Sequence, residues 1–174
     1  MTPRVSVVMA THDHAPYVAQ AIRSVLDQTF RDFEFLIVDD GSRDDTPRVV
    51  EQFDDPRIVF RTSAENRGSA ARRNELVEAS RGQYIAVQNS DDYWTLDKLA
   101  RQVEFLDAHP EYAATFSGAS FVDADGAPLW RDVPSPSLPV RPGEPFPRGV
   151  AAPLLRRRER ALPSERHDAE HVCG

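Results

Sequence analysis

Four short apolar runs, each followed by a segment that reads as a helix, constrain the fold of this chain more than any other feature. The runs are typical of strands buried on both faces, and they lie at residues 5–9, 33–38, 57–61 and 84–88. Apolar spacing, start signals or composition predict helices over residues 15–28, 46–53, 68–79 and 95–106. This alternation predicts an α/β fold with a mostly parallel sheet.

The pattern continues less regularly after the fourth helix. A further strand is expected over residues 112–122, followed by a turn at residues 123–126 and a possible return strand at residues 127–130.

Charge and proline are distributed unevenly along the chain. Its 174 residues include 28 Asp and Glu against 21 Lys and Arg, for a formal net charge of −7, which argues against a general nucleic-acid binder. Residues 1–133 carry −9 and residues 134–174 carry +2, and 8 of the 14 prolines lie in the second segment. We therefore expect a folded domain over residues 1–133 and a poorly ordered, Pro- and Arg-rich tail over residues 134–174.

Features of secreted or membrane-spanning proteins are missing from the sequence. The single cysteine, Cys173, allows no internal disulfide framework and no cysteine metal cluster. No apolar window approaches the length of a membrane span, and the N-terminus has no signal-peptide pattern. We expect the chain in the cytoplasm, either free or peripheral to the inner face of the membrane.

Polar and acidic residues follow three of the predicted strands. Thr11 and His12 follow the first strand, Asp39 and Asp40 the second, and Asp91 with Asp92 the fourth. Ligands of open α/β sheets bind beyond the carboxyl ends of the strands. Carboxylates there can accept hydrogen bonds from ribose hydroxyls or a base N–H, or hold a divalent cation on a diphosphate.

Other readings of these residues exist. Asp, Gly and Ser at residues 39–42 are typical of turns, the acids at residues 91–92 of solvated loops, and adjacent arginines at residues 72–73 of a solvated helix face. The loop over residues 10–16 lacks glycine, and neither a dinucleotide-binding nor a P-loop motif occurs. This pattern disfavours a dinucleotide-binding domain and a P-loop NTPase.

An ordered set of motifs resembles family 2 glycosyltransferases of the GT-A fold. The motifs are VSVVMATHD at residues 5–13, SVLDQTF at 24–30, IVDDGS at 37–42, ENRG at 65–68, ARRN at 71–74 and YIAVQNSDD at 84–92. They cover roughly residues 4 to 125. The resemblance implies a Rossmann-like, three-layer α/β/α domain that binds a nucleotide-sugar, incomplete at its C-terminus.

The resemblance also implies a base-binding side of the site. By analogy with the family, Ala10, Thr11 and His12 lie against the nucleotide base, and Asp40 hydrogen-bonds the base while Asp39 supports the loop. The usual aromatic residue is replaced here by His12, whose ring can still stack on a base.

On the other side of the site, the resemblance implies a metal and the sugar donor. Asp91 is expected to contact the donor ribose or the metal, and Asp92 to hold Mn²⁺ or Mg²⁺ on the diphosphate. Arg73 is expected to face the donor. Asn89 stands where the family commonly has Asp, which removes one negative charge near the metal.

These expectations define a leading function and its alternatives. The leading function is metal-dependent transfer of a sugar from a nucleoside diphosphate sugar, most simply a UDP-sugar, to an unidentified acceptor, with inversion. The general base of such enzymes is not identifiable, so the alternative is a non-catalytic or truncated nucleotide-sugar-binding fragment whose tail is a frameshift product. A nucleotidyltransferase is a third reading, but the expected glycine-rich, lysine-bearing loop is missing.

Overall fold

Strands and helices alternate along the first two thirds of the chain. The computed structural model describes residues 2–123, 127, 138–140 and 151–156. Its elements are β1 Val5–Thr11, α1 Ala15–Leu26, β2 Phe33–Asp40, α2 Thr46–Glu51, β3 Ile58–Ser63, α3 Ser69–Ala79, β4 Tyr84–Asn89, α4 Lys98–Ala108, β5 Ala114–Ser117, β6 Leu138–Val140 and β7 Ala151–Arg156. The four predicted strand–helix units are all present, which confirms the α/β prediction.

The strands form one mixed sheet of seven strands in the order β3-β2-β1-β4-β7-β5-β6. Strands β3, β2, β1 and β4 are parallel neighbours, whereas β7 is antiparallel to both β4 and β5, and β6 is antiparallel to β5. Strands β1 to β5 therefore all run in one direction. Their carboxyl ends lie at the same edge of the sheet, where the predicted site residues lie.

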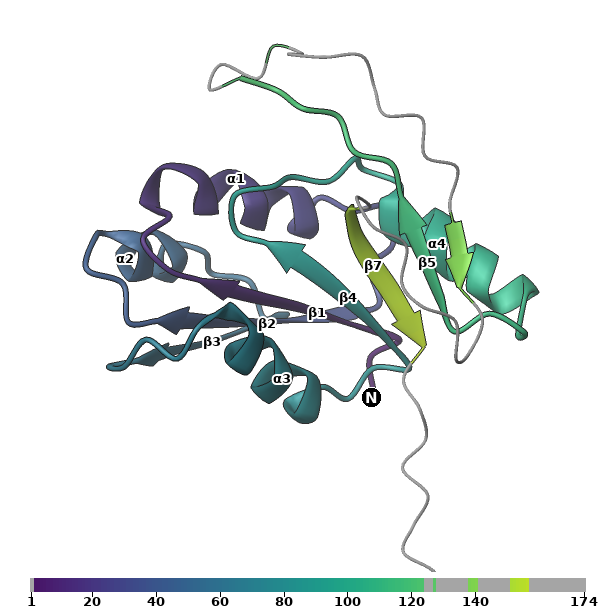
Figure 1. Ribbon diagram of the computed structural model, residues 1–174, viewed down its shortest axis with the longest axis horizontal. Coiled ribbons are helices and arrows are strands. Elements are labelled where there is room, and N and C mark those ends of the chain that lie inside the picture. Colours follow the sequence, from purple (N-terminus) through teal and green to yellow (C-terminus); the bar gives the residue numbers. More distant parts are fainter. Residues whose placement is uncertain (1, 124–126, 128–137, 141–150, 157–174) are drawn as a thin grey trace, which may run out of the picture.

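Helices cover both faces of the sheet (Figure 1). On one face, α1, α2 and α4 pack on alternate residues of the central strands, among them Val7, Met9 and Phe35, which are fully buried. On the other face, α3 packs through Leu76 on Val8 and its neighbours. Strand residues that are apolar on both faces explain the continuous apolar runs of the sequence, because neither face meets water.

Two strands come from the segment that was expected to lack regular structure. Leu138–Val140 pairs with β5, and Ala151–Arg156 lies between β4 and β5, with Leu154 fully buried. The expectation of a poorly ordered tail is therefore wrong for these two segments. They lack a regular apolar pattern, but hydrogen bonds to neighbouring strands hold them in the sheet. The domain division at residue 133 stays a prediction, and the rest of that segment lies outside the described residues.

Some predicted boundaries shift. The strand expected over residues 112–122 covers only Ala114–Ser117, and the possible return strand at residues 127–130 lies outside the described residues apart from Ala127. The fourth helix begins at Lys98, and Asp97 occupies the N-cap position that was expected for Thr95. The Thr95 hydroxyl donates to the Asp97 carboxylate instead. None of the described helices is long and apolar enough to cross a membrane.

Candidate functional site

The register of the sheet aligns the ends of its central strands. Thr11 of β1 lies beside Asp39 of β2, and Ala10 of β1 lies beside Asn89 of β4. The segments that follow β1, β2 and β4 therefore meet at one edge of the sheet, where an open α/β fold binds its ligand.

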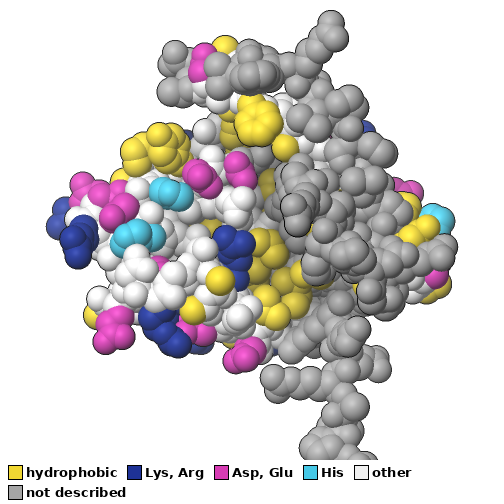
Figure 2. Space-filling view, viewed as in Figure 1, with side chains coloured by type: hydrophobic (Ala, Val, Ile, Leu, Met, Phe, Trp, Pro, Cys, Tyr) yellow, Lys and Arg dark blue, Asp and Glu magenta, His cyan; other side chains and the backbone are white. Residues whose placement is uncertain are grey.

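A pocket of about 380 Å³ opens at this edge. It is lined by Ala10, Thr11, His12, His14, Asp40, Ser69, Arg73, Asn89, Ser90 and Asp91. Six of the eight predicted site residues are among them, and the exceptions are Asp39 and Asp92. Figure 2 shows histidine, acidic and basic side chains gathered on this face of the molecule.

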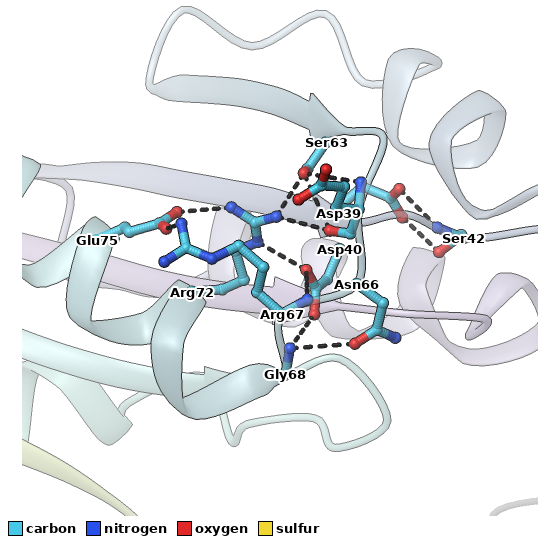
Figure 3. A network of polar contacts seen from close by, with 10 residues as sticks. Asp39, Asp40, Ser42, Ser63, Asn66, Arg67, Gly68, Arg72 and Glu75 are labelled. Atoms are coloured by element: carbon cyan, nitrogen blue, oxygen red, sulfur yellow. Dashed lines mark hydrogen bonds and ion pairs between the residues drawn. The ribbon is translucent and has the colours of Figure 1, made fainter.

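Asp40 is the most firmly held acid of the pocket wall. Its carboxylate accepts hydrogen bonds from the Arg67 N–H at 2.9 Å, the Gly68 N–H at 2.7 Å and Arg72 Nε at 2.6 Å (Figure 3). The Gly68 backbone has φ of +85°, a conformation that favours glycine, at the start of α3. Three of about four acceptor positions of the carboxylate are filled, which leaves one on Oδ2 for a ligand N–H.

The same contacts set the charge of Asp40. Burial alone would raise the pKa of its carboxyl, but the hydrogen bonds and the charge of Arg72 outweigh burial and hold the pKa below its usual value. The hydrogen bond to Asp40 is in turn the main cause that raises the Arg72 pKa. Asp40 is therefore a fixed anion at neutral pH.

The Arg72 guanidinium bonds Asp40 and three further residues around it. Its side chain is 8% exposed, and it donates to Glu75 at 2.9 Å, to the Glu65 carbonyl at 2.7 Å and to the Ser63 hydroxyl (Figure 3). It joins β2, β3 and α3 behind the pocket wall. Arg73, the arginine that the sequence nominated, lies one residue further along α3 and lines the pocket itself.

Asp39 faces the loop after β2 instead of the pocket. Its carboxylate accepts hydrogen bonds from the Ser42 N–H at 3.0 Å and from the Ser42 hydroxyl. Ser42 Oγ in turn accepts from the Asp13 N–H at 2.9 Å, so the loops after β1 and β2 are joined. Asp39 thus bonds the loop after β2, and its nominated role in binding the donor nucleotide stays a prediction.

Two polar atoms at the end of β1 are buried without partners in the described part of the chain. Thr11 Oγ1 and His12 Nδ1 are buried, and neither has a hydrogen-bond partner among the described residues. His14 is tied to the loop after β4, because its Nδ1 lies 2.7 Å from Ser90 Oγ. Buried polar atoms without partners lower the stability of a fold.

The loop between β4 and α4, residues 90–97, carries the acid pair and is called the acid loop below. Asp91 and Asp92 are both exposed. Asn89 Nδ2 donates to Asp92 Oδ2 at 2.8 Å, so the amide that replaces the common Asp directs the Asp92 carboxylate instead of repelling it.

A second pocket, of about 500 Å³, shares Asp91 with the first. Its wall includes Asp92, Trp94 and Lys98, together with Tyr93 and Phe121, which are 44% and 58% exposed. Lys98 is buried, and burial lowers its pKa to about 7. Two pockets that meet at one acid suit a reaction between two bound molecules.

The donor set of the acid loop fits a particular kind of cation site. Among the described residues, no group of three or more His, Cys, Asp or Glu side chains could enclose a metal ion. Mg²⁺ and similar hard cations, however, are held by one or two carboxylates when substrate phosphates supply further ligands. The exposed carboxylates of Asp91 and Asp92 fit that arrangement and do not fit a cage made of protein alone.

Four pocket residues were absent from the sequence-based nomination of site residues: His14, Ser69, Asn89 and Ser90. Ser69 lies one turn before Arg73 on α3, and both line the pocket. Asn89 and Ser90 lie inside the motif at residues 84–92, and His14 directly follows the motif at residues 5–13. Nothing in the sequence shows that His14 and Ser90 contact each other across 76 positions. Ser69 could have been predicted from Arg73, because residues four positions apart lie on the same face of a helix.

The fold defines an α/β domain of the GT-A type, and comparison with known proteins agrees. The family model "Glycosyl transferase family 2" matches residues 6–153. The chain belongs to this family.

Curated relatives support the assignment. TuaG of Bacillus subtilis, provisionally named a teichuronic acid biosynthesis glycosyltransferase, is 38% identical over 77% of this chain. WfaP of Escherichia coli, named a UDP-Glc:α-D-GlcNAc-diphosphoundecaprenol β-1,3-glucosyltransferase, is 33% identical over 59% of this chain. The chain spans 54% of the length of TuaG and 41% of that of WfaP, about half of these relatives.

Solved structures match the same region. TarS of S. aureus in complex with UDP-GlcNAc superposes with a TM-score of 0.60 at 26% identity, covering 64% of this chain and 33% of that chain. The mannosyltransferase PcManGT of Pyrobaculum calidifontis in complex with GDP-Man and Mn²⁺ gives a TM-score of 0.62 at 26% identity, covering 70% of this chain and 36% of that chain.

Proposed function

We propose that this chain binds a nucleoside diphosphate sugar, most simply a UDP-sugar, and transfers its sugar to an acceptor with the help of Mn²⁺ or Mg²⁺. One observation carries the proposal above all: the ends of β1, β2 and β4 form a pocket lined by a fixed anion, Asp40, by Arg73 and by one of a pair of exposed carboxylates. WfaP is named for a UDP-sugar donor, and TarS binds UDP-GlcNAc.

The base and ribose belong in the first pocket in this proposal. The open acceptor position on Asp40 takes a base N–H, and the His12 ring stacks on the base. Arg73 faces the donor from α3 and opposes the negative charge of its phosphates.

The diphosphate belongs at the acid loop. Asp91 and Asp92 hold the divalent cation together with the phosphate oxygens, and Asn89 directs the Asp92 carboxylate. When bound, the cation neutralises the negative charge that develops on the departing diphosphate. The support for a metal is the donor chemistry of the loop and the Mn²⁺ in the PcManGT complex.

The acceptor belongs in the second pocket, because that pocket shares Asp91 with the first. Its exposed aromatic side chains, Tyr93 and Phe121, offer apolar faces, and its polar residues offer hydrogen-bond partners. We expect inversion at the anomeric carbon, as the family resemblance implies.

Release of UDP tests transfer directly. The chain is incubated with UDP-glucose or UDP-N-acetylglucosamine and Mn²⁺, and free UDP is measured over time, with water as the acceptor. We expect release that depends on Mn²⁺ and is lost in Asp92→Asn. UDP binding with no release from either donor would favour the alternative, a chain that binds the donor without transferring its sugar.

A further inference from the structure

Two buried glutamine side chains bond the backbone of the acid loop, one at Asp92 and the other at Thr95. Gln88, near the end of β4, donates from Nε2 to the Asp92 carbonyl at 2.6 Å. Gln28, two residues after α1, donates from Nε2 to the Thr95 carbonyl at 2.7 Å. The residues are 1% and 0% exposed. The loop that carries Asp91 and Asp92 is therefore bonded through its backbone at Asp92 and again at Thr95.

Gln28 makes the larger set of contacts. Its Nε2 also donates to the Ser24 carbonyl at 2.9 Å, and its Oε1 accepts the Leu99 N–H at 2.9 Å. The adjacent Thr29 N–H donates to the Leu96 carbonyl at 2.8 Å. The end of α1 is thus bonded to the acid loop and to the first turn of α4. No residue of the motif at residues 24–30 lines the first pocket. Through Gln28 and Thr29, however, the motif contacts the acid loop beside that pocket.

Gln88 holds the loop at a cost to stability. Its Oε1 is buried without a hydrogen-bond partner among the described residues. Such an unpaired group destabilises a fold, and a methionine of similar length would avoid that cost. The benefit of glutamine at this position is its Nε2 donor, which fixes the backbone of Asp92.

We propose that Gln28 and Gln88 are positioning residues, which hold the acid loop so that the carboxylates of Asp91 and Asp92 are arranged for a cation before the donor arrives. This inference rests on the proposed function. A loop that is already ordered loses little conformational entropy on binding, so the same carboxylates bind more tightly. Loss of a partner that orients a metal ligand typically weakens metal binding about 10- to 100-fold.

Gln88→Met separates positioning from stability. We expect a melting temperature that is unchanged or higher, because the unpaired Oε1 is removed. We expect faster hydrogen exchange of the amides of residues 91–97, and about tenfold weaker Mn²⁺ binding in the presence of UDP, read from the electron paramagnetic resonance signal of free Mn²⁺. In Gln28→Met, the Leu99 amide should also exchange faster, since its acceptor is lost.

Ser6→Ala is the matched control. Ser6 lies at the opposite end of β1, and its hydroxyl donates to Glu34 at 2.6 Å and accepts the Gly82 N–H at 2.8 Å. The control should lower the melting temperature and leave Mn²⁺ binding and loop exchange unchanged.

The inference is overturned if Gln88→Met leaves both loop exchange and Mn²⁺ binding at their wild-type values. A wild-type chain that binds neither UDP nor Mn²⁺ would count against the proposed function. Loop exchange needs no ligand, so in that case it still decides whether the glutamines hold the loop.

Discussion

Arg72 and Arg73 are neighbours in the sequence with different surroundings. Arg72 is buried and bonded to Asp40 at 2.6 Å, whereas Arg73 is half-buried, lines the pocket and has no ion pair among the described residues. Removing one partner of a buried ion pair leaves the other charge uncompensated. Arg73 instead lies on the pocket wall, where we propose that it contacts the donor.

Substitution of each arginine by methionine should therefore give different results. Arg72→Met should lower the free energy of unfolding by about 3 kcal/mol, measured by urea denaturation. Arg73→Met should change it by no more than about 0.5 kcal/mol and weaken UDP binding about tenfold. Equal losses of stability in the two variants would contradict this assignment.

Acid should destabilise the fold through its bonded carboxyls. The pKa values of Glu34, Asp40, Asp44 and Asp55 are all below their usual values of 4.5 for Glu and 3.8 for Asp. Folded carboxyls with lowered pKa values stabilise the protein above the unfolded pKa, and this contribution is lost as pH falls through the folded pKa. We expect these groups to leave the free energy of unfolding nearly constant from pH 7 to about 5, and to make it fall steeply below about pH 4.

Urea denaturation of the wild type and of Arg72→Met between pH 3 and 7 checks this expectation. The variant should show a shallower fall, because Asp40 has lost its charged partner. Parallel curves would show that Asp40 contributes nothing to the acid dependence.

At the residue scale, motif and strand-end reasoning found most of the pocket wall but misjudged one arginine. Asp40 and Arg73 could be nominated because they follow local patterns. Arg72 could not be told from a solvated residue, since its partner lies 32 positions away and only the fold brings them together. The tie between His14 and Ser90 was hidden for the same reason.

Among the elements, β7 is the one that sequence patterns predicted least well. Its two leucines are preceded by Pro153 and followed by arginines, so no strand period is visible. The strand nevertheless lies between β4 and β5, and Leu154 joins the larger core cluster. By contrast, the central parallel strands were predictable because burial on both faces produces uninterrupted apolar runs.

Leu154→Ala tests whether β7 is part of the folded domain. Removal of a fully buried leucine side chain should lower the free energy of unfolding by about 2–4 kcal/mol. Leu96→Ala is the control, because Leu96 is 60% exposed and should change stability little. Equal, small effects in both variants would show that residues 151–156 do not pack on the sheet in solution.

For the whole molecule, the central claim is that one edge of the sheet joins a nucleotide pocket to a cation-binding acid pair. The two pockets meet at Asp91, and the acid loop between them is anchored by Gln28 and Gln88. Family membership is shown by the match over residues 6–153, while the donor, the metal and the acceptor are proposals that this arrangement supports.

Calorimetric titration of the full chain with UDP, with and without Mn²⁺, tests that claim most directly. We predict binding that Mn²⁺ strengthens, and loss of the Mn²⁺ effect in Asp92→Asn. In the control Asp54→Asn, an exposed acid away from both pockets is changed, so the Mn²⁺ effect should persist. UDP binding that is equally strong with and without Mn²⁺, or an Asp92→Asn variant that keeps the full Mn²⁺ effect, would contradict the account.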